Sequence, residues 1–449
     1  MTTIVVVVAL SVTIILVAAL LPIVGLRRLA VAGLLVSLLF APYPLFDSPN
    51  GPIHHGMTDA KYVPYTYSIA IAVCLVLFAR ERGVVQWVSS AVGSAAYLLL
   101  LLTFVWSGES RELAGVLHLL TGLLAFALGI GIGQWLLTDL RNASLWLYVV
   151  LGILAVQTAI MFAQLLGLPI GLYGTTAYFV AEGRPVGTFI HPSVPGKVAL
   201  LLLPSLLVFT RLRSRQMRYL AWGSITLATL ATALTQSRAN LAAILCALLL
   251  WVVLDRRRTF RKRMILGSAF VLASVPVAAI TLPRFLSDPE GGDRAQLLRT
   301  ALDVLPRYFW QGLGANSYSA VVGQFDALAA NGFPVHLTLL HLVVELGVIG
   351  AILIHAPLLA AGVVLVKRYR HAWPANDAAL ALLVVIPGLI LIYVTGWGLL
   401  LQGVFALWLF AVGTSVGLAL ADAPRTIVTR APGAPSHHTR SEVASDSSV

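Results

Sequence analysis

Apolar segments of about 20 residues recur from one end of the sequence to the other, and this feature leaves very few architectures open. A segment of that length can cross the roughly 30 Å hydrocarbon core of a bilayer as an α-helix. The composition agrees: 59% of the 449 residues are hydrophobic and 11% are charged, against roughly 25% charged residues in an average soluble domain. The sequence therefore predicts an all-α polytopic membrane protein and excludes a soluble fold.

Hydrophobicity along the chain predicts about 12–13 transmembrane helices. The first apolar segment lacks a basic n-region and a small-residue cleavage site, so we interpret it as a retained helix and not as a signal peptide. The expected spans are 3–25, 29–46, 65–80, 84–106, 113–137, 145–169, 195–210, 218–235, 239–254, 264–282, 336–365, 378–396 and 398–420.

The basic residues between the spans predict the orientation. The densest basic clusters, at 211–218, 255–263 and 367–370, fall in alternate loops, and the positive-inside rule places them in the cytoplasm. The N-terminus is then outside and the C-terminus inside; if the first segment is not a span, both ends are inside and the later helices keep their orientation. The net charge of +12 is explained by this topology, so nucleic acid is not an expected partner.

Two of the predicted outer loops, near 170–194 and 283–335, are long, and loops of such length usually carry function. The second loop contains a predicted amphipathic helix that begins after Asp293, its expected N-cap, and ends at Pro306. The apolar stripe of this helix is expected to consist of Leu297, Leu298, Ala301 and Leu305.

Nine of the 30 Lys and Arg residues fall on the predicted outer side, where the positive-inside rule disfavours them. A phosphate group is one reason for a cation there, because guanidinium groups bind phosphate with paired, charge-assisted hydrogen bonds; lipid headgroup contact or a solvated loop is the alternative. Arg238 stands out because it occupies a tight turn between two apolar spans, where an isolated charge is costly. The nine residues are Lys61, Arg111, Arg184, Lys197, Arg238, Arg284, Arg294, Arg299 and Arg307.

His336 is the best candidate for proton transfer. Pro334 favours an extended backbone before it, so His336 is expected at the N-terminus of the next membrane helix. The helix dipole there disfavours imidazolium, which suits a general base, although a histidine that only caps a helix at the interface is the alternative. His341 and Glu345 are four residues apart and share a helix face, so we expect a structural pair and not a dyad with His336.

The sequence gives no support for a metal or a cofactor. It contains no HExxH motif, no GxxxxGK[ST] phosphate loop and no GxSxG elbow, and its two cysteines lie inside apolar runs. His54 and His55 could bind a metal ion weakly, but a solvated loop is the better interpretation.

Three segments, taken in order, resemble the O-antigen ligase and polymerase family. They are GRPVGTFIHPSVPGKVALLLLP at 183–204, LTQSRANLAAILCALLL at 234–250, and DRAQLLRTALDVLPRYFWQGLGANSY at 293–318 followed by HLTLLHLVVELGVIG at 336–350. That family has a similar series: a GRxxGTF loop, an SR after a Thr-ended span, an Arg-led loop helix followed by PxxGxG, and HNxxLxxLxExG at a helix start. Each piece is weak alone, and the order and spacing make the resemblance specific.

The resemblance implies a membrane glycosyltransferase that transfers or polymerises glycan from an undecaprenyl-diphosphate-linked donor onto an acceptor hydroxyl. The acceptor could be a lipid-anchored sugar, a growing glycan or a protein side chain. It implies that Arg238 and Arg294, with Arg184 as a third residue, hold the diphosphate and that His336 activates the hydroxyl, with His341 and Glu345 in supporting positions. The reaction would be inverting and metal-independent, on the periplasmic or extracellular side of the plasma (inner) membrane. The sequence departs from the family pattern at Leu337, where Asn or Ser is usual, and at His341, which replaces Gln.

The resemblance also suggests how the chain is divided. We expect N-terminal transmembrane helices in 1–170, a catalytic region in 171–365 that includes the outer loop 283–335, C-terminal transmembrane helices in 366–422, and a disordered cytoplasmic tail in 423–449, which is rich in Pro, Ser, Thr, Ala and His.

A transporter or flippase of polyprenyl-linked or other anionic lipids is the alternative function, because it would need the same arginines. Transporters usually place ionisable groups near the middle of the bilayer. Among the predicted spans, the one that contains Glu345 is the only one with an internal Asp or Glu. This pattern favours chemistry at the outer face over ion-coupled transport, and leaves uncoupled flipping open.

Overall fold

The structure is a computed structural model that describes residues 24–40, 65–90, 93–97, 108, 110–168, 170, 176–255, 257, 259–279, 293–371, 373–396 and 398–421. The regular elements in these ranges are helices. They are α2 (Leu26–Leu39), α3 (Thr66–Phe78), α4 (Arg82–Val88), α6 (Ser110–Leu136), α7 (Leu140–Leu165), α8 (Thr176–Ala181), α9 (Ser193–Phe209), α10 (Arg215–Leu234), α11 (Arg238–Val253), α12 (Phe260–Ala279), α14 (Arg294–Tyr308), α15 (Tyr318–Val322), α16 (Ala327–Ala330), α17 (Thr338–Arg368), α18 (Ala375–Thr395) and α19 (Gln402–Leu420).

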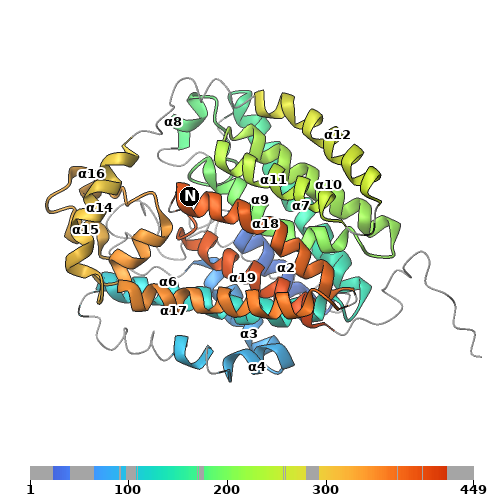
Figure 1. Ribbon diagram of the computed structural model, residues 1–449, viewed down its shortest axis with the longest axis horizontal. Helices are drawn as coiled ribbons and strands as arrows, with labels where there is room; N and C mark the ends of the chain where they lie inside the picture. Colours follow the sequence, from blue (N-terminus) through green and yellow to red (C-terminus); the bar gives the residue numbers. More distant parts are fainter. Residues whose placement is uncertain are drawn as a thin grey trace, which may run out of the picture.

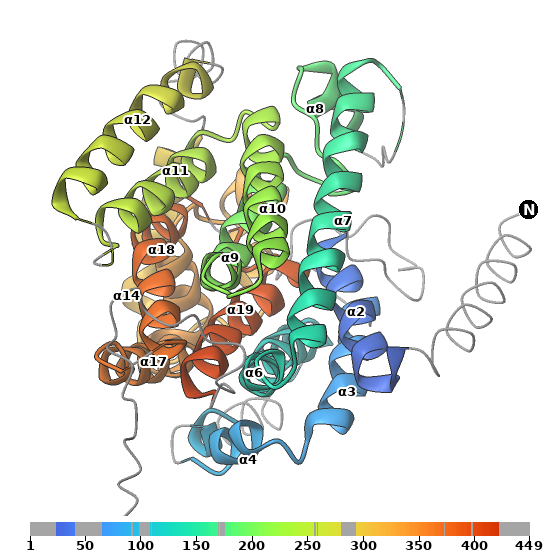
Figure 2. The ribbon, with the colours of Figure 1, turned by 90° about the vertical axis from the view of Figure 1, so that its right-hand side faces the viewer.

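Five helices in the described part of the chain, α6, α7, α17, α18 and α19, are long and apolar enough to cross a membrane, and α3, α9 and α11 are shorter apolar helices. This confirms the predicted class, an all-α multi-pass membrane protein. Several of the long helices run nearly parallel or antiparallel, and α6, α9 and α17 are seen almost end-on in Figure 2. The predicted first span, the tail, the His54–His55 pair, Lys61 and Arg284 lie outside the described residues.

Two of the predicted spans are interrupted. The span expected at 84–106 is broken after α4, because the Ser90 side chain accepts a hydrogen bond from the Gly93 backbone N–H and donates one to the Trp87 carbonyl. The span expected at 336–365 corresponds to α17, in which Gly347 has φ 69° and ψ 170° and breaks the helical path. Glycine adopts this backbone conformation without steric cost.

The centre of the bundle is the contact between α6 and α19. Gly129 and Gly133 of α6 face Gly413 and Gly417 of α19 across a backbone-to-backbone contact. A Cβ on Gly133 would lie 2.3 Å from the carbonyl oxygen of Thr414. Small residues at four-residue spacing on both helices allow this close approach, as they do in many membrane helix pairs.

Ion pairs join the connections that the sequence assigns to the cytoplasm. They fix α2 to the α6–α7 turn and to the α3–α4 turn, and the segment after α11 to the α9–α10 turn and to the start of α18. Their nitrogen–oxygen distances are 2.7 or 2.8 Å, and the pairs are Arg27–Glu81, Arg28–Asp139, Arg211–Asp255 and Arg257–Asp377.

The long loop after α12 folds into a small helical unit. Figure 1 shows α14, α15 and α16 together at one end of α6 and α17. Asp326 caps α16 by accepting a 2.9 Å hydrogen bond from the Ala329 backbone N–H, and it also accepts one from the Thr300 hydroxyl of α14. This unit and the neighbouring α17 share a hydrophobic cluster of Ala301, Val304, Tyr318, Val322, Ala329, Val335, Leu340 and Val344.

The predicted loop helix was right in its start and wrong in two details. It begins after Asp293, whose side chain makes no capping hydrogen bond, and it continues through Pro306 to Tyr308. Leu298, expected in the apolar stripe, is 39% exposed, whereas Val304 is buried. Pro306 has no backbone N–H group, so the last turn of this helix lacks one hydrogen bond.

Candidate functional site

His336 lies two residues before α17 and is half-buried. Pro334 and Val335, which precede it, are buried and lie outside the helix. The Thr338 hydroxyl, at the first position of α17, donates a 2.6 Å hydrogen bond to the carbonyl oxygen of Gly396 in the α18–α19 connection. This bond fixes the start of α17, and with it the backbone that carries His336, against the neighbouring helix connection.

Arg238 is the first residue of α11 and is half-buried. The turn before it is tight because Gln236 takes a left-handed conformation with φ 53°. The Asn240 side-chain amide donates hydrogen bonds to the Ser193 carbonyl oxygen at 2.7 Å and to the Ser237 hydroxyl at 2.8 Å. The start of α11 is therefore held against the start of α9.

Arg184 belongs to the GRPVGTF segment between α8 and α9, and its guanidinium carbon lies 5.4 Å from the centre of the Phe179 ring. The backbone of this segment is held by two glutamines of α7. Gln164 accepts hydrogen bonds from the N–H groups of Val186 and Gly187 at 2.9 and 3.0 Å, and Gln157 accepts one from the N–H of Thr188 at 3.0 Å. Buried backbone groups need such partners, so the two amides shape the loop.

The loop that carries Arg184 also contacts the turn that carries Arg238. The Gln236 side-chain amide donates a 3.2 Å hydrogen bond to the carbonyl oxygen of Gly183, the residue before Arg184. The structure thus joins the backbones next to these two arginines, as expected if they act at one site.

Arg294 is the first residue of α14 and is exposed. It lies within electrostatic range of the Lys197 ammonium group, near the start of α9, so their positive charges repel each other. The helical unit of the long loop therefore brings Arg294 to the same end of the bundle as the starts of α9 and α11.

His341 and Glu345 are buried in α17 and form the predicted pair, with 3.6 Å between His341 Nε2 and Glu345 Oε2. The Glu345 carboxylate also accepts hydrogen bonds from the backbone N–H groups of Asn316 at 3.1 Å and Tyr318 at 3.0 Å. Glu345 thus anchors the loop after α14 to α17, which is a structural role.

The same loop replaces the helical hydrogen bonds that are lost at Gly347. The N–H groups of Leu313 and Gly314 donate to the carbonyl oxygens of Val344 and Glu345, each at 2.9 Å, and the N–H of Val348 donates to the Phe309 carbonyl oxygen at 2.8 Å. The GLG segment at 312–314 is therefore built into the broken helix, and this brings the end of α14 close to α17.

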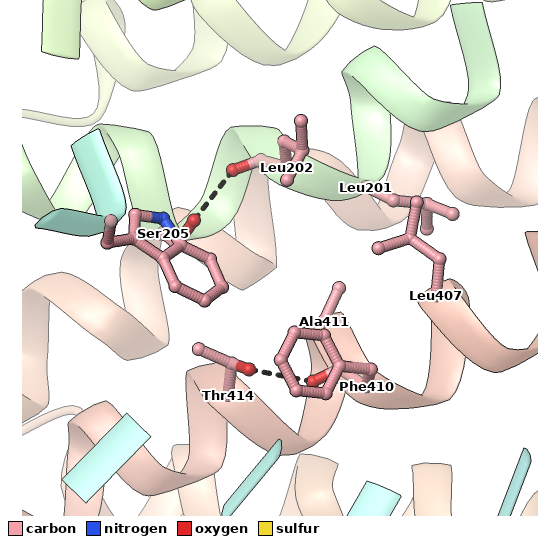
Figure 3. Close-up of a pocket in the computed structure, with 8 residues that line it drawn as sticks. Leu201, Leu202, Ser205, Leu407, Phe410, Ala411 and Thr414 are labelled. Atoms are coloured by element: carbon pink, nitrogen blue, oxygen red, sulfur yellow. Dashed lines mark hydrogen bonds between the residues drawn. The ribbon is translucent and has the colours of Figure 1, made fainter. Parts of the chain in front are cut away.

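A small apolar cavity lies away from these residues, between α7, α9 and α19 (Figure 3). The two hydroxyl groups in its wall, of Ser205 and Thr414, donate to carbonyl oxygens of their own helices. This cavity offers no group for catalysis and belongs to the packing of the bundle. It is lined by Trp146, Leu201, Leu202, Ser205, Leu407, Phe410, Ala411 and Thr414.

Sequence reasoning missed three residues that shape this region. Gln157 and Gln164 are spaced by seven in an apolar helix, and two amides on one face of a membrane span are a detectable signal for a buried polar contact. Lys197 was among the predicted outer cations, but nothing in the sequence predicted that it is buried. The residue is only 5% exposed.

The comparison with known families bears on the same region. Residues 223–355 match the family model described as O-antigen ligase (Wzy_C), a range that holds Arg238, Arg294, His336, His341 and Glu345, with Arg184 before it. A search of curated proteins gives no match. Residues 223–355 of this multi-pass membrane protein are therefore similar to the O-antigen ligase family.

Proposed function

We propose that the protein is a glycosyltransferase that moves or polymerises glycan from an undecaprenyl-diphosphate-linked donor onto an acceptor hydroxyl at the outer face of the plasma membrane. The main observation behind the proposal is that α9, α11 and α14 begin close to one another. The Asn240–Ser193 hydrogen bond joins the first two, and the nearness of Arg294 to Lys197 adds the third. Helix N-termini and arginines both favour a bound phosphate group.

The reaction is a displacement at the anomeric carbon of the donor. The acceptor oxygen forms a bond to this carbon on the face opposite the diphosphate, the bond from the carbon to the diphosphate oxygen breaks, and the configuration inverts. His336 accepts the hydroxyl proton as the new bond forms. Arg184, Arg238 and Arg294 stabilise the negative charge that develops on the leaving undecaprenyl diphosphate.

The acceptor is a hydroxyl group of a growing glycan or of a lipid-anchored sugar. The outer-face assignment is supported by the basic clusters at the ends of the helices opposite the proposed site, at 211–218, 255–263 and 367–370. The catalytic region of the proposal spans 171–365, so the GRPVGTF segment and α9 act together with the O-antigen ligase domain.

The test is the release of undecaprenyl diphosphate by protein reconstituted in proteoliposomes with an undecaprenyl-diphosphate-linked oligosaccharide and candidate acceptors, in EDTA. Wild type and Arg213→Ala, an exposed arginine in a basic cluster, should release it, and Arg238→Ala and His336→Ala should not. Inversion is checked by the anomeric configuration of the product. Movement of the donor lipid across the bilayer without release would support the alternative, a flippase of anionic lipids.

A further inference from the structure

Lys197 is a buried cation one turn after Ser193, the first residue of α9. The residue is 5% exposed, and its ammonium group donates hydrogen bonds to the Ser193 hydroxyl at 2.8 Å and to the Ser193 carbonyl oxygen at 3.3 Å. That carbonyl oxygen also accepts the hydrogen bond from Asn240. In the described part of the chain, no carboxylate lies within ion-pair distance of the ammonium group. Among the described residues, the hydrogen-bond partners of this charge are therefore the two neutral oxygens of Ser193.

The surroundings of Lys197 disfavour a positive charge. Burial removes the charge from water, Arg294 repels it, and the N-terminal end of a helix carries a partial positive charge of its own. A buried cation that meets these three conditions is stabilised most directly by an anion.

Lys197 also lies between the two parts of the proposed site, which are the segment that carries His336 and the turn that carries Arg238. A Cβ on Gly398 would be 2.8 Å from both Cε and Nζ of Lys197, so the α18–α19 connection covers the ammonium group closely. The same connection accepts the hydrogen bond from Thr338, two residues after His336, through the Gly396 carbonyl oxygen. Asn240 joins the Ser193 carbonyl oxygen, which Lys197 also contacts, to the first turn of α11, where Arg238 lies.

We infer that Lys197 is a further binding residue for the diphosphate group of the donor, and this inference rests on the proposed function. Arg294 is exposed and Lys197 is buried, so the site offers cations at two depths, which fits two linked phosphate groups better than one. Lys197 therefore helps the site to select a diphosphate over a monophosphate. Ser193 positions the ammonium group as its hydrogen-bond acceptor.

The experiment compares wild type with Lys197→Met and Lys197→Leu, in nanodiscs of phosphatidylcholine. Undecaprenyl diphosphate and undecaprenyl monophosphate are the probes, and binding and thermal unfolding are measured. Loss of one charge-assisted contact should raise the Kd for undecaprenyl diphosphate roughly 10- to 100-fold. The ratio between the Kd values for the monophosphate and the diphosphate should therefore become smaller. Without a probe, both variants should unfold at the same temperature as wild type or higher. Lys367→Met, which replaces an exposed lysine at the other end of α17, should leave all values unchanged.

Lower unfolding temperatures or loss of folding in both variants would overturn the inference, because Lys197 would then stabilise the protein without ligand. An unchanged Kd in variants that fold would also overturn it. In nanodiscs of phosphatidylglycerol, a stabilisation that depends on Lys197 without any probe would show a site for lipid headgroups instead. If wild type neither binds undecaprenyl diphosphate nor releases it from the donor, the proposed function is wrong. If wild type binds undecaprenyl diphosphate and the Lys197 variants bind it with the same Kd, only the role of Lys197 is wrong.

Discussion

The side-chain amide of Asn240 donates a 2.7 Å hydrogen bond to the carbonyl oxygen of Ser193, and this bond joins the start of α11 to the start of α9. It sets the position of Arg238 relative to Lys197, and on our proposal the positions of two cations of the diphosphate site. Both partners of the bond are in the first turn of their helices, so a small change here moves both.

We expect Asn240→Ala to lower the stability of the protein by about 1–3 kcal/mol, because the side chain is buried and its loss removes two hydrogen bonds, each of which contributes about 0.5–1.5 kcal/mol. In the release assay, KM for the donor should rise more than kcat falls, since Asn240 positions the cations and does not touch the reacting atoms. Asn331→Ala, which replaces an exposed asparagine of the long loop, is the control. An unchanged KM would show that this bond does not shape the donor site.

Glu345→Ala should loosen the loop after α14. Its carboxylate satisfies two buried backbone N–H groups, of Asn316 and Tyr318, and each buried donor left without a partner costs about 1–3 kcal/mol. Hydrogen exchange at residues 313–318 should therefore increase by at least about tenfold. Asp303→Asn, an exposed carboxylate of α14, should have no such effect. Protection equal to wild type in Glu345→Ala would contradict the anchoring role.

Gly133→Leu should disrupt the contact between α6 and α19. A Cβ at this position would lie 2.3 Å from a backbone oxygen, which cannot move aside as a side chain can. Overpacking of a well-packed core typically costs about 1–3 kcal/mol of stability, and we expect Gly133→Leu to lose at least this much. Size-exclusion chromatography after heating in detergent should show that less folded protein remains than in wild type. Gly152→Leu is the matched control, since nothing lies within 4 Å of a Cβ at Gly152 in α7. Equal stability of the two variants would be evidence against the glycine contact.

The helical unit of α14–α16 should lose stability in acid. The backbone N–H of Ala329 holds the pKa of Asp326 below its usual value, burial opposes this shift, and the hydrogen bonds from Thr300 and Gln296 add to it. The carboxylate therefore stabilises the folded unit at pH values above its unfolded pKa of about 4, and this stability is lost as the pH falls through the lower folded pKa. Hydrogen exchange of residues 296–330 should rise over that range in wild type. Asp326→Asn should remove this part of the pH dependence, and an identical pH profile in the variant would exclude Asp326 as its source.

The sequence predicted the parts of the fold that depend on local pattern. The long apolar spans predicted α6, α7, α17, α18 and α19. Arg294 was expected directly after the N-cap Asp293 and is the first residue of α14, whereas Arg238 was expected in the turn before a span and is the first residue of α11. His336 was expected at a helix start from Pro334 and lies two residues before α17. These features follow from hydrophobicity and from backbone preferences over a few residues.

The features that sequence reasoning missed are contacts between distant segments. Gln157 and Gln164 bind backbone groups more than 20 residues away, and the break at Gly347 is stabilised by the segment after α14. The burial of Lys197 depends on Gly398, about 200 residues later. Hydrophobic periodicity contains no information about which loop will fill a gap in a helix, so these contacts appear only in the folded chain.

The central claim is that His336 takes the acceptor proton in a site where arginines hold the diphosphate, and separate measurement of donor binding and of single-turnover glycan transfer tests it most directly. We predict that His336→Ala binds the donor as wild type does but transfers glycan about 10²- to 10⁴-fold more slowly, whereas Arg238→Ala binds the donor more weakly. Transfer by His336→Ala at the wild-type rate would contradict the account.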